Sequence, residues 1–326
     1  NDLLYGKLTH ESQELEQRKP KVAKERWPVA AQLLCKELSA SREDNSRICA
    51  KANPKCSISL RLHFPDCFVR FCTPEFHSEH EKNQTEKVVV LNQMLRGFSF
   101  IDGVKKAVEA ECPGVVSCAD IVALVARDSV VVTRGPYWKV PTGRRDGRIS
   151  NASEALANIP PPTSNFSSLQ TSFASKGLDF KDLVLLSGAH TIGVSHCPSF
   201  SSRLYNFTGV WGEQDPSLNR EYAANLKMKK CKSINDNTTI VKMDPRSSSK
   251  FDLSYFQLVL KRKGLFQSDA ALTTSATTKS FINHLVQGSL KQFYVEFGVA
   301  MEKMGKIEVK TGSAGEIRKH CAAVNR

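Results

Sequence analysis

Two segments of the chain hold residues whose types and spacing could do chemistry. The first is 60–69, which reads LRLHFPDCFV and places Arg61 four residues before Pro65. Residues four apart share one face of a helix, so the guanidinium of Arg61 would lie beside position 65. Such an arginine either forms a structural salt bridge or stabilises negative charge that develops during a reaction. Pro65 has no titratable group, so its side chain cannot transfer protons.

The second segment is 185–193, LLSGAHTIG, which places His190 among small and apolar residues. A single histidine in such a string is most often a packed core or surface residue. As a metal ligand it would be tuned by the group at its other ring nitrogen, and a carboxylate there raises the basicity of the imidazole. Asp269 ends the stretch KGLFQSD at 263–269, and without further context it is expected to be an exposed loop residue.

Helices must position these residues, because apolar residues recur at helical spacing and little of the chain alternates with period two. The recurring positions are Ile101, Val104 and Val108, and later Phe293, Phe297, Met301 and Met304. Residues 117–134 are more uniformly apolar, as in a helix buried within a bundle. Glycine and proline breakers at 135–136, 160–162 and 209–216 separate the helices. We therefore expect a mainly α fold without an extensive sheet.

These stretches together resemble the secreted plant haem peroxidases (class III). Segment 60–69 is similar to the distal pattern R-x-x-F-H-D-C of that family, and 185–193 is similar to its proximal helix. Segment 263–269 is similar to the family pattern K-G-L-[LF]-x-S-D. The similarity is nearly continuous from about residue 96 to residue 326.

The resemblance implies a two-lobed helical fold with haem between the lobes. The haem peroxidase domain would span 29–326, with a distal lobe at about 29–159 and a proximal lobe at about 160–326. The tri-proline loop at 160–162 would divide them. Residues 1–28 are an N-terminal extension to which we assign no function.

The resemblance also assigns roles in the haem site. His190 is expected to be the axial ligand of a haem b iron, with Asp269 as its carboxylate partner. In the family, the histidine that follows the distal phenylalanine carries a proton between the two oxygens of hydrogen peroxide, and here that position is Pro65. Arg61 would polarise the peroxide and stabilise charge on the departing oxygen. The other expected positions are Phe64 over the haem face, Asn92 as the residue that orients the distal histidine, and Pro160 near the exposed haem edge.

Two calcium sites are implied in the same way, since calcium prefers oxygen ligands. The proximal set is complete in spacing and comprises Thr191, Asp244, Ser247, the Lys250 carbonyl and Asp252. The distal set keeps Asp66 and the Val69 carbonyl. Its other positions are altered, because Phe71 replaces a glycine, Thr73 a carboxylate and Glu75 a serine. Calcium is therefore expected at the proximal site, and the distal site is left open.

Cysteines and glycosylation sequons point to secretion. The chain has ten cysteines, which indicates an oxidising compartment. The family resemblance, not spacing, pairs eight of them as Cys35–Cys112, Cys67–Cys72, Cys118–Cys321 and Cys197–Cys231, and gives Cys49 and Cys56 no partner. N-x-[ST] sequons occur at Asn83, Asn151, Asn165, Asn206 and Asn237. We expect a secreted, extracellular or cell-wall protein, with the vacuole as the alternative, although 1–28 lack the apolar core of a signal peptide.

The formal net charge is +13, and it raises the question of an acidic partner. Nucleic acid is disfavoured, because the basic residues are dispersed and are not interleaved with aromatic ones. Acidic cell-wall polysaccharide is the sharper expectation, together with hydrogen peroxide and small phenolic donors. No apolar run approaches the roughly 18–20 residues of a membrane span, so no membrane association is expected. The family resemblance implies a monomer.

Two functions stay open at this point. One is a haem peroxidase that uses hydrogen peroxide to oxidise phenolic donors in one-electron steps. The other is a haem-binding pseudo-peroxidase, impaired at Pro65, that acts as a basic cell-wall-binding glycoprotein. The departures from the family cluster in the N-terminal part, which indicates either a derived homologue or errors in that part of the sequence. A zinc site at His77 and His80 is disfavoured, because the spacing H-E-x-x-H is missing.

Overall fold

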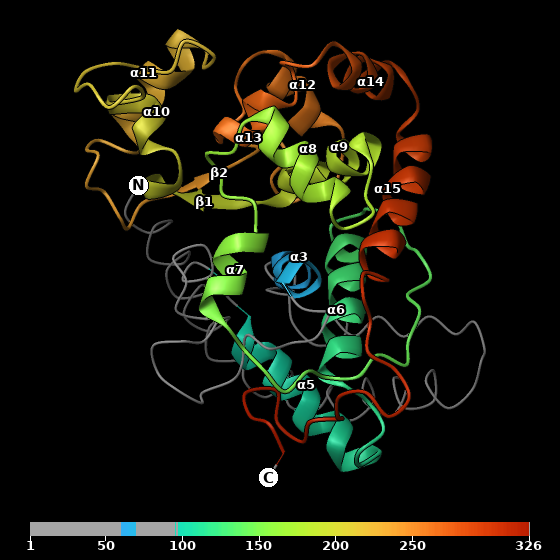
Figure 1. The fold of residues 1–326 in the computed structure, drawn as a ribbon. Helices are drawn as coiled ribbons and strands as arrows, with labels where there is room; N and C mark the ends of the chain where they lie inside the picture. The colour runs from blue at the N-terminus through green and yellow to red at the C-terminus, as the bar shows by residue number, and fades with distance from the viewer. Residues whose placement is uncertain (1–59, 70–94, 96, 326) are drawn as a thin grey trace, which may run out of the picture.

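The structure is a computed structural model that describes residues 60–69, 95 and 97–325 (Figure 1). Its described part is mainly helical, which confirms the predicted fold class. The first group of helices comprises α3 (Leu60–Val69), α5 (Phe98–Glu111), α6 (Cys118–Val132) and α7 (Ala152–Asn158). The second comprises α8 (Phe166–Ala174), α9 (Phe180–Ser187), η4 (Gly188–Ile192), α12 (Ser254–Leu260), α13 (Gln267–Ala271), α14 (Ala276–Gln287) and α15 (Leu290–Met304).

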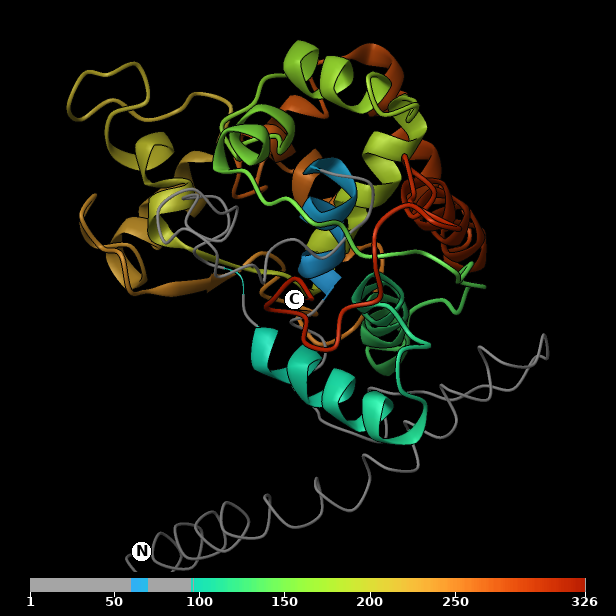
Figure 2. The same ribbon diagram turned by 60° about the horizontal axis from the view of Figure 1, so that its bottom comes forward.

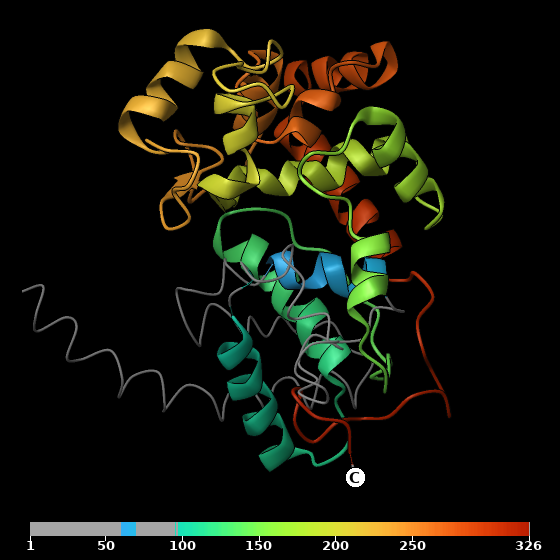
Figure 3. The same ribbon diagram turned by 60° about the vertical axis from the view of Figure 1, so that its left-hand side comes forward.

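The two groups lie one above the other in Figures 1 and 3, and the chain crosses between them after α7. Helix α3 packs against α6 and α7, and α9 packs against α8, α14 and α15. One hydrophobic cluster includes Phe68 of α3, Ala126 and Val130 of α6, and Phe256 and Phe297 of the second group. The core therefore joins both groups, and it places α3 opposite the segment that carries His190.

The helical periodicities of the sequence mark the buried faces. In α5, Ile101, Val104 and Val108 are buried. In α6 every residue from Cys118 to Val130 is buried. In α15 the buried side chains include those of Phe293, Phe297, Met301 and Met304. The sequence predictions for these three helices are confirmed.

A smaller unit projects beside the second group. It contains η5 (Cys197–Ser199), α10 (Ser201–Tyr205) and α11 (Arg220–Lys229). Strand β1 (Val194–His196) pairs antiparallel with β2 (Ile240–Lys242), and Ser195 lies opposite Val241. The disulfide Cys197–Cys231 closes this unit. None of the helices in the described ranges is both long and apolar enough to cross a membrane.

Candidate active site

His190 lies in η4, directly after α9 has ended at Ser187. Its Nδ1 is 2.9 Å from Oδ1 of Asp269, although the two residues are 79 positions apart in the sequence. The rings of Tyr255 and Phe266 meet the imidazole edge to face, with centroids 5.5 and 5.3 Å away. The carboxylate and the two rings fix the orientation of the imidazole.

Asp269 is buried, and its second oxygen also has a partner. Oδ1 accepts a hydrogen bond from the Tyr255 hydroxyl at 2.8 Å, and Oδ2 accepts one from the Phe266 amide at 2.9 Å. Burial alone would raise the pKa of Asp269, but His190 and these hydrogen bonds outweigh burial and hold the pKa below its ordinary value. Burial and the adjacent Asp269 raise the pKa of Tyr255 well above its ordinary value, so its hydroxyl remains a donor. Asp269 is therefore held in its ionised form. It is buried, and not an exposed loop residue.

The loop that carries Asp269 is held by a buried arginine. Arg203 of α10 donates from Nη1 to the carbonyl oxygens of Gly264, Leu265 and Phe266 at 2.7–2.8 Å. Its own charge is paired with Asp215, since Nε lies 2.6 Å from Oδ2. Gly264 is required where the loop turns, because a Cβ there would lie 2.5 Å from the Cβ of Asp269.

The geometry around His190 fits an axial haem ligand. Asp269 engages Nδ1, and no described residue bonds to Nε2. The His190 side chain is 33% exposed, whereas Asp269 is 1% exposed. An imidazole whose Nε2 is open and whose Nδ1 contacts a carboxylate has the usual arrangement of a metal-binding histidine. The residues present are therefore suited to hold a haem iron from this side.

Helix α3 presents Arg61 and Pro65 from the other group of helices. Arg61 is exposed, yet desolvation by the surrounding protein lowers the pKa of its guanidinium. Pro65 is buried, and α3 continues through it. A proline inside a helix removes one backbone hydrogen bond and crowds the preceding turn. The helix is nevertheless continuous through position 65, whose side chain carries no titratable group.

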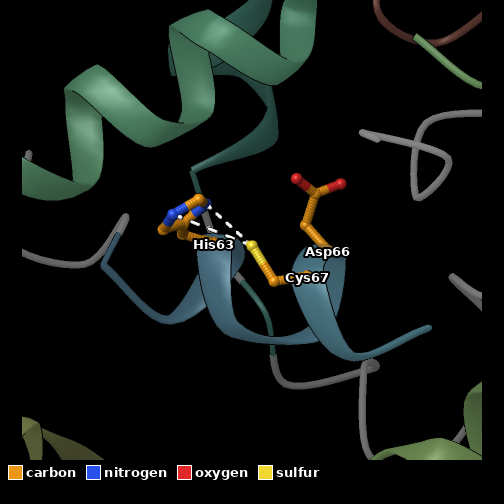
Figure 4. A group of neighbouring side chains, drawn as sticks. All are labelled: His63, Asp66 and Cys67. Atoms are coloured by element: carbon orange, nitrogen blue, oxygen red, sulfur yellow. Dashed lines mark hydrogen bonds between the residues drawn. The ribbon is translucent and has the colours of Figure 1, made fainter. Parts of the chain in front are cut away.

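Helix α3 also carries a histidine, His63. It is buried on α3, and its Nδ1 lies 3.6 Å from Sγ of Cys67 (Figure 4). Burial, with a smaller contribution from the charge of Arg144, lowers the pKa of His63 to about 3. An imidazole of that pKa is a poor base, and side chains two residues apart on a helix, such as those of Arg61 and His63, do not face each other.

The same figure shows Asp66 close to His63 and Cys67, within 4.8 Å by their potential ligand atoms. Cys67 is disulfide-bonded, and a metal site would need its thiolate. The cluster is therefore a packed part of the helix and not a metal centre.

Phe64 of α3 is partly buried. Its ring stacks on Phe68 with centroids 4.1 Å apart, and Phe173 of α8 lies 6.2 Å away. The phenylalanine thus bridges α3 and the second group of helices.

Pro160 is half-buried in the loop that follows α7. That loop is tied to the His190 side, because Ser268 donates its amide to the carbonyl of Pro162 at 3.0 Å.

Four oxygens expected at the proximal calcium site converge in the structure. The Ser247 hydroxyl lies 2.9 Å from Oδ2 of Asp244 and 3.1 Å from Oδ1 of Asp252. The Thr191 hydroxyl lies 3.5 and 3.4 Å from the same two oxygens. Asp244 and Thr191 are fully buried, and Nζ of Lys250 is 4.0 Å from the second oxygen of Asp252. Two carboxylates and two hydroxyls in this arrangement fit a hard cation.

Of the distal calcium set, the described residues include Asp66 and Val69, both buried in α3. Several expected residues lie outside the described part of the chain: Phe71, Thr73, Glu75, His77, His80, Asn83, Asn92 and 1–28. Cys35, Cys49, Cys56 and Cys72 also lie outside the described part.

Among the described cysteines, Cys67 and Cys112 are disulfide-bonded. The structure joins Cys118 to Cys321 and Cys197 to Cys231, the same pairs that the family resemblance implies.

Sequence reasoning missed Tyr255 and Arg203. Both act on Asp269, one through its carboxylate and one through the carbonyls of its loop. Neither lies in a stretch with a recognisable spacing, and their role depends on contacts between distant segments. The buried ion pair of Arg144 with Asp120, 2.8 Å long, was missed for the same reason.

Comparisons with known proteins agree with this geometry. The family model described as "Peroxidase" matches residues 37–288. Peroxidase 3 of Arabidopsis thaliana is 64% identical over 266 residues, which cover 82% of this chain and 81% of the relative. Peroxidase 39 of Arabidopsis thaliana is 60% identical over 268 residues, with 82% of each chain covered. Peroxidase 1 of Oryza sativa subsp. japonica is 53% identical over 270 residues, again with 82% of each covered.

Proposed function

Since this chain belongs to the plant peroxidase family and is a haem peroxidase, we propose that its haem is held by His190 and that peroxide reacts beside Arg61. The observation that supports this most directly is the 2.9 Å contact between His190 and the buried Asp269. The bound haem would supply one-electron oxidation of a donor at the expense of hydrogen peroxide. Asp269 keeps the proton on Nδ1 and so keeps Nε2 available as the ligand atom.

On the opposite side, Arg61 would bind and polarise the peroxide. A guanidinium whose pKa is lowered by desolvation still remains charged, because arginine ordinarily titrates above about 12. Its charge would stabilise the oxygen that departs. Pro65 has no group that could carry a proton from one peroxide oxygen to the other. The enzyme is therefore proposed to work slowly, at a rate set by this missing group.

Phenolic donors are proposed to reach the haem edge beside Pro160. The tri-proline loop is held to the start of α13, next to Asp269, by the bond from Ser268 to Pro162. A donor at this loop would thus lie near the His190 side of the site. The loop also marks the proposed boundary between the distal lobe at about 29–159 and the proximal lobe at about 160–326.

Replacement of the axial ligand tests the function. His190→Ala should lower haem affinity and the oxidation of a phenol such as guaiacol by at least about a hundredfold, because even an outer partner of a metal ligand contributes 10–100-fold. The affinity is measured by absorbance titration with haem, and the rate by steady-state assay with hydrogen peroxide. His284→Ala removes an exposed imidazole from α14 and is the matched control. Unchanged haem affinity in His190→Ala would disprove the assignment.

Calcium is proposed at the cluster of Thr191, Asp244, Ser247 and Asp252. Among the described residues, the cationic group nearest to these two carboxylates is Nζ of Lys250, 4.0 Å from Asp252. A bound divalent ion would therefore balance their charge. The distal site is proposed to be weaker or empty, because a carboxylate and a glycine of the family pattern are replaced at Thr73 and Phe71.

Chelation should lower the stability of the protein. An ion present at about 100 times its dissociation constant stabilises the folded state by about 2.7 kcal/mol, and removal with excess chelator should lower the melting temperature correspondingly. Asp252→Asn should melt lower from the start and respond much less to the chelator. The control Glu221→Gln, on the exposed face of α11, should respond as the parent does. A chelator response that is equal in Asp252→Asn and the parent would place calcium elsewhere.

The protein is further proposed to be a secreted monomer that is attracted to acidic cell-wall polysaccharide. Its net charge of +13 and its disulfides support this proposal. The impaired pseudo-peroxidase remains the alternative that Pro65 alone would favour, and the family match does not favour it.

A further inference from the structure

A surface pocket of about 660 Å³ lies at the C-terminal end of the chain, away from His190. Its lining residues are Gly114, Arg145, Arg148, Glu316, Ile317, Val324 and Asn325. They come from the turn after α5, the loop after α6 and the C-terminal segment, which lie together in Figures 1 and 2. No role of the haem site accounts for these residues.

Two guanidinium groups meet in this pocket, and one of them, that of Arg145, has too few acceptors. Nη2 of Arg145 lies 3.5 Å from the carbonyl oxygen of Gly315, and Nη2 of Arg148 lies 3.4 Å from the same oxygen. Nε of Arg145 is buried and has no hydrogen-bond acceptor. Two like charges that share one neutral oxygen at the limit of hydrogen bonding repel each other, and an anion between them would relieve this repulsion.

Glu316 is the acidic residue in the lining, and other groups already engage it. Its Oε1 accepts the Asn325 amide at 2.9 Å and lies 3.7 Å from Nε of the buried Arg318. Its Oε2 lies 3.3 Å from Nε of Arg148. This carboxylate contacts Arg148 and Arg318, and the lining itself holds two arginines against one glutamate, so the pocket keeps a net positive charge.

The frame of the pocket is rigid. Asp146 and Glu316 form an antiparallel β-bridge with hydrogen bonds of 2.7 and 2.9 Å. The Asp146 carboxylate also accepts the amides of Cys118, Ala119 and Arg318. The disulfide Cys118–Cys321 anchors the C-terminal segment to α6. A rigid frame lowers the ordering cost of binding, so the arginines are presented in a fixed arrangement.

We infer that this pocket binds a carboxylate of an acidic, uronic-acid-containing polysaccharide through Arg145 and Arg148. Arginine forks match planar carboxylates in a bidentate manner. The pocket is open to solvent on one side, which suits a unit of a long chain better than an enclosed small molecule. This inference rests on the proposed attraction to wall polysaccharide, and it gives that attraction a defined site.

The test compares polygalacturonate with its methyl-esterified, uncharged form. The parent holoprotein should bind the acid form at least about tenfold more tightly at moderate salt. Arg145→Gln with Arg148→Gln should lower that affinity by about 10–100-fold, since hydrogen bonds to charged groups contribute the most. Lys229→Gln with Lys230→Gln removes the same charge from the exposed end of α11 and should change it less than threefold. Peroxide-dependent phenol oxidation should be unchanged in all variants.

Arg148→Gln alone guards against a folding defect, because the Arg148 side chain is 63% exposed. It should lower the affinity severalfold without lowering the melting temperature. Equal losses in the pocket and α11 variants would overturn the site while leaving the general attraction intact. Absence of any preference for the acid form would overturn both. Binding of inorganic phosphate or single-stranded DNA in preference to polygalacturonate, with dependence on the two arginines, would overturn the ligand class.

Discussion

Pro65→His should raise the rate at which the haem-loaded protein reacts with hydrogen peroxide by about 10²–10⁴. The reason is that a positioned imidazole carries a proton from one peroxide oxygen to the other, which proline cannot do. The new side chain would lie one helical turn after Arg61, on the same face of α3. The rate is measured by stopped-flow absorbance with peroxide in excess.

Pro65→Ala separates proton transfer from repair of the helix. Both substitutions restore the backbone donor and relieve the crowding, which is expected to stabilise α3 by up to about 3 kcal/mol. Only the histidine variant should gain peroxide reactivity. His63→Gln in the parent should leave the rate unchanged, because His63 is buried and its pKa is lowered to about 3. An equal gain in Pro65→Ala and Pro65→His would show that helix geometry, not the imidazole, limits the reaction.

The result of this experiment also distinguishes the two functions that the sequence leaves open, an active haem peroxidase and an impaired pseudo-peroxidase. If the parent already reacts as fast as Pro65→His, another group transfers the proton, and the chain is a fully competent enzyme. If only the variant reacts quickly, the chain has the haem site of the family without its acid–base catalyst. Because α3 stays helical through Pro65, the side chain at position 65 alone decides between these two outcomes.

Sequence patterns predicted the helices better than the links between them. Spacing predicted the buried faces of α5 and α15, and apolar content predicted the burial of α6, because both are local properties of a helix. The pairing of His190 with Asp269 followed from two family patterns and not from spacing. No pattern predicted Tyr255 or Arg203, because their partners are in segments that only the fold brings together. The same holds for the pocket at Arg145 and Arg148, which three distant segments form.

Asp269→Ala should weaken haem binding by about 10–100-fold, because His190 loses the partner that orients it. It should also lower the free energy of unfolding by about 3–5 kcal/mol, since it breaks a buried pair and leaves the Tyr255 hydroxyl and the Phe266 amide without their acceptor. Tyr255→Phe is the matched control. It removes one donor to Asp269 and should cost about 1 kcal/mol with little effect on haem affinity. Equal loss of haem affinity in both variants would contradict the orienting role of Asp269.

The dependence on pH distinguishes the carboxylate from a merely structural group. The pKa of Asp269 in the folded protein lies below its ordinary value, so the native state binds this proton less readily than the unfolded chain. The resulting stability is fully present above about pH 4, near the pKa of an unfolded aspartate, and is lost as the pH falls through the folded pKa. The unfolding free energies of the parent and Asp269→Asn, measured with urea, should therefore differ most near neutral pH and converge in acid. A difference that stays constant down to pH 2 would mean that the ionised carboxylate does not stabilise the site, and His190 would then be oriented by the rings of Tyr255 and Phe266 alone.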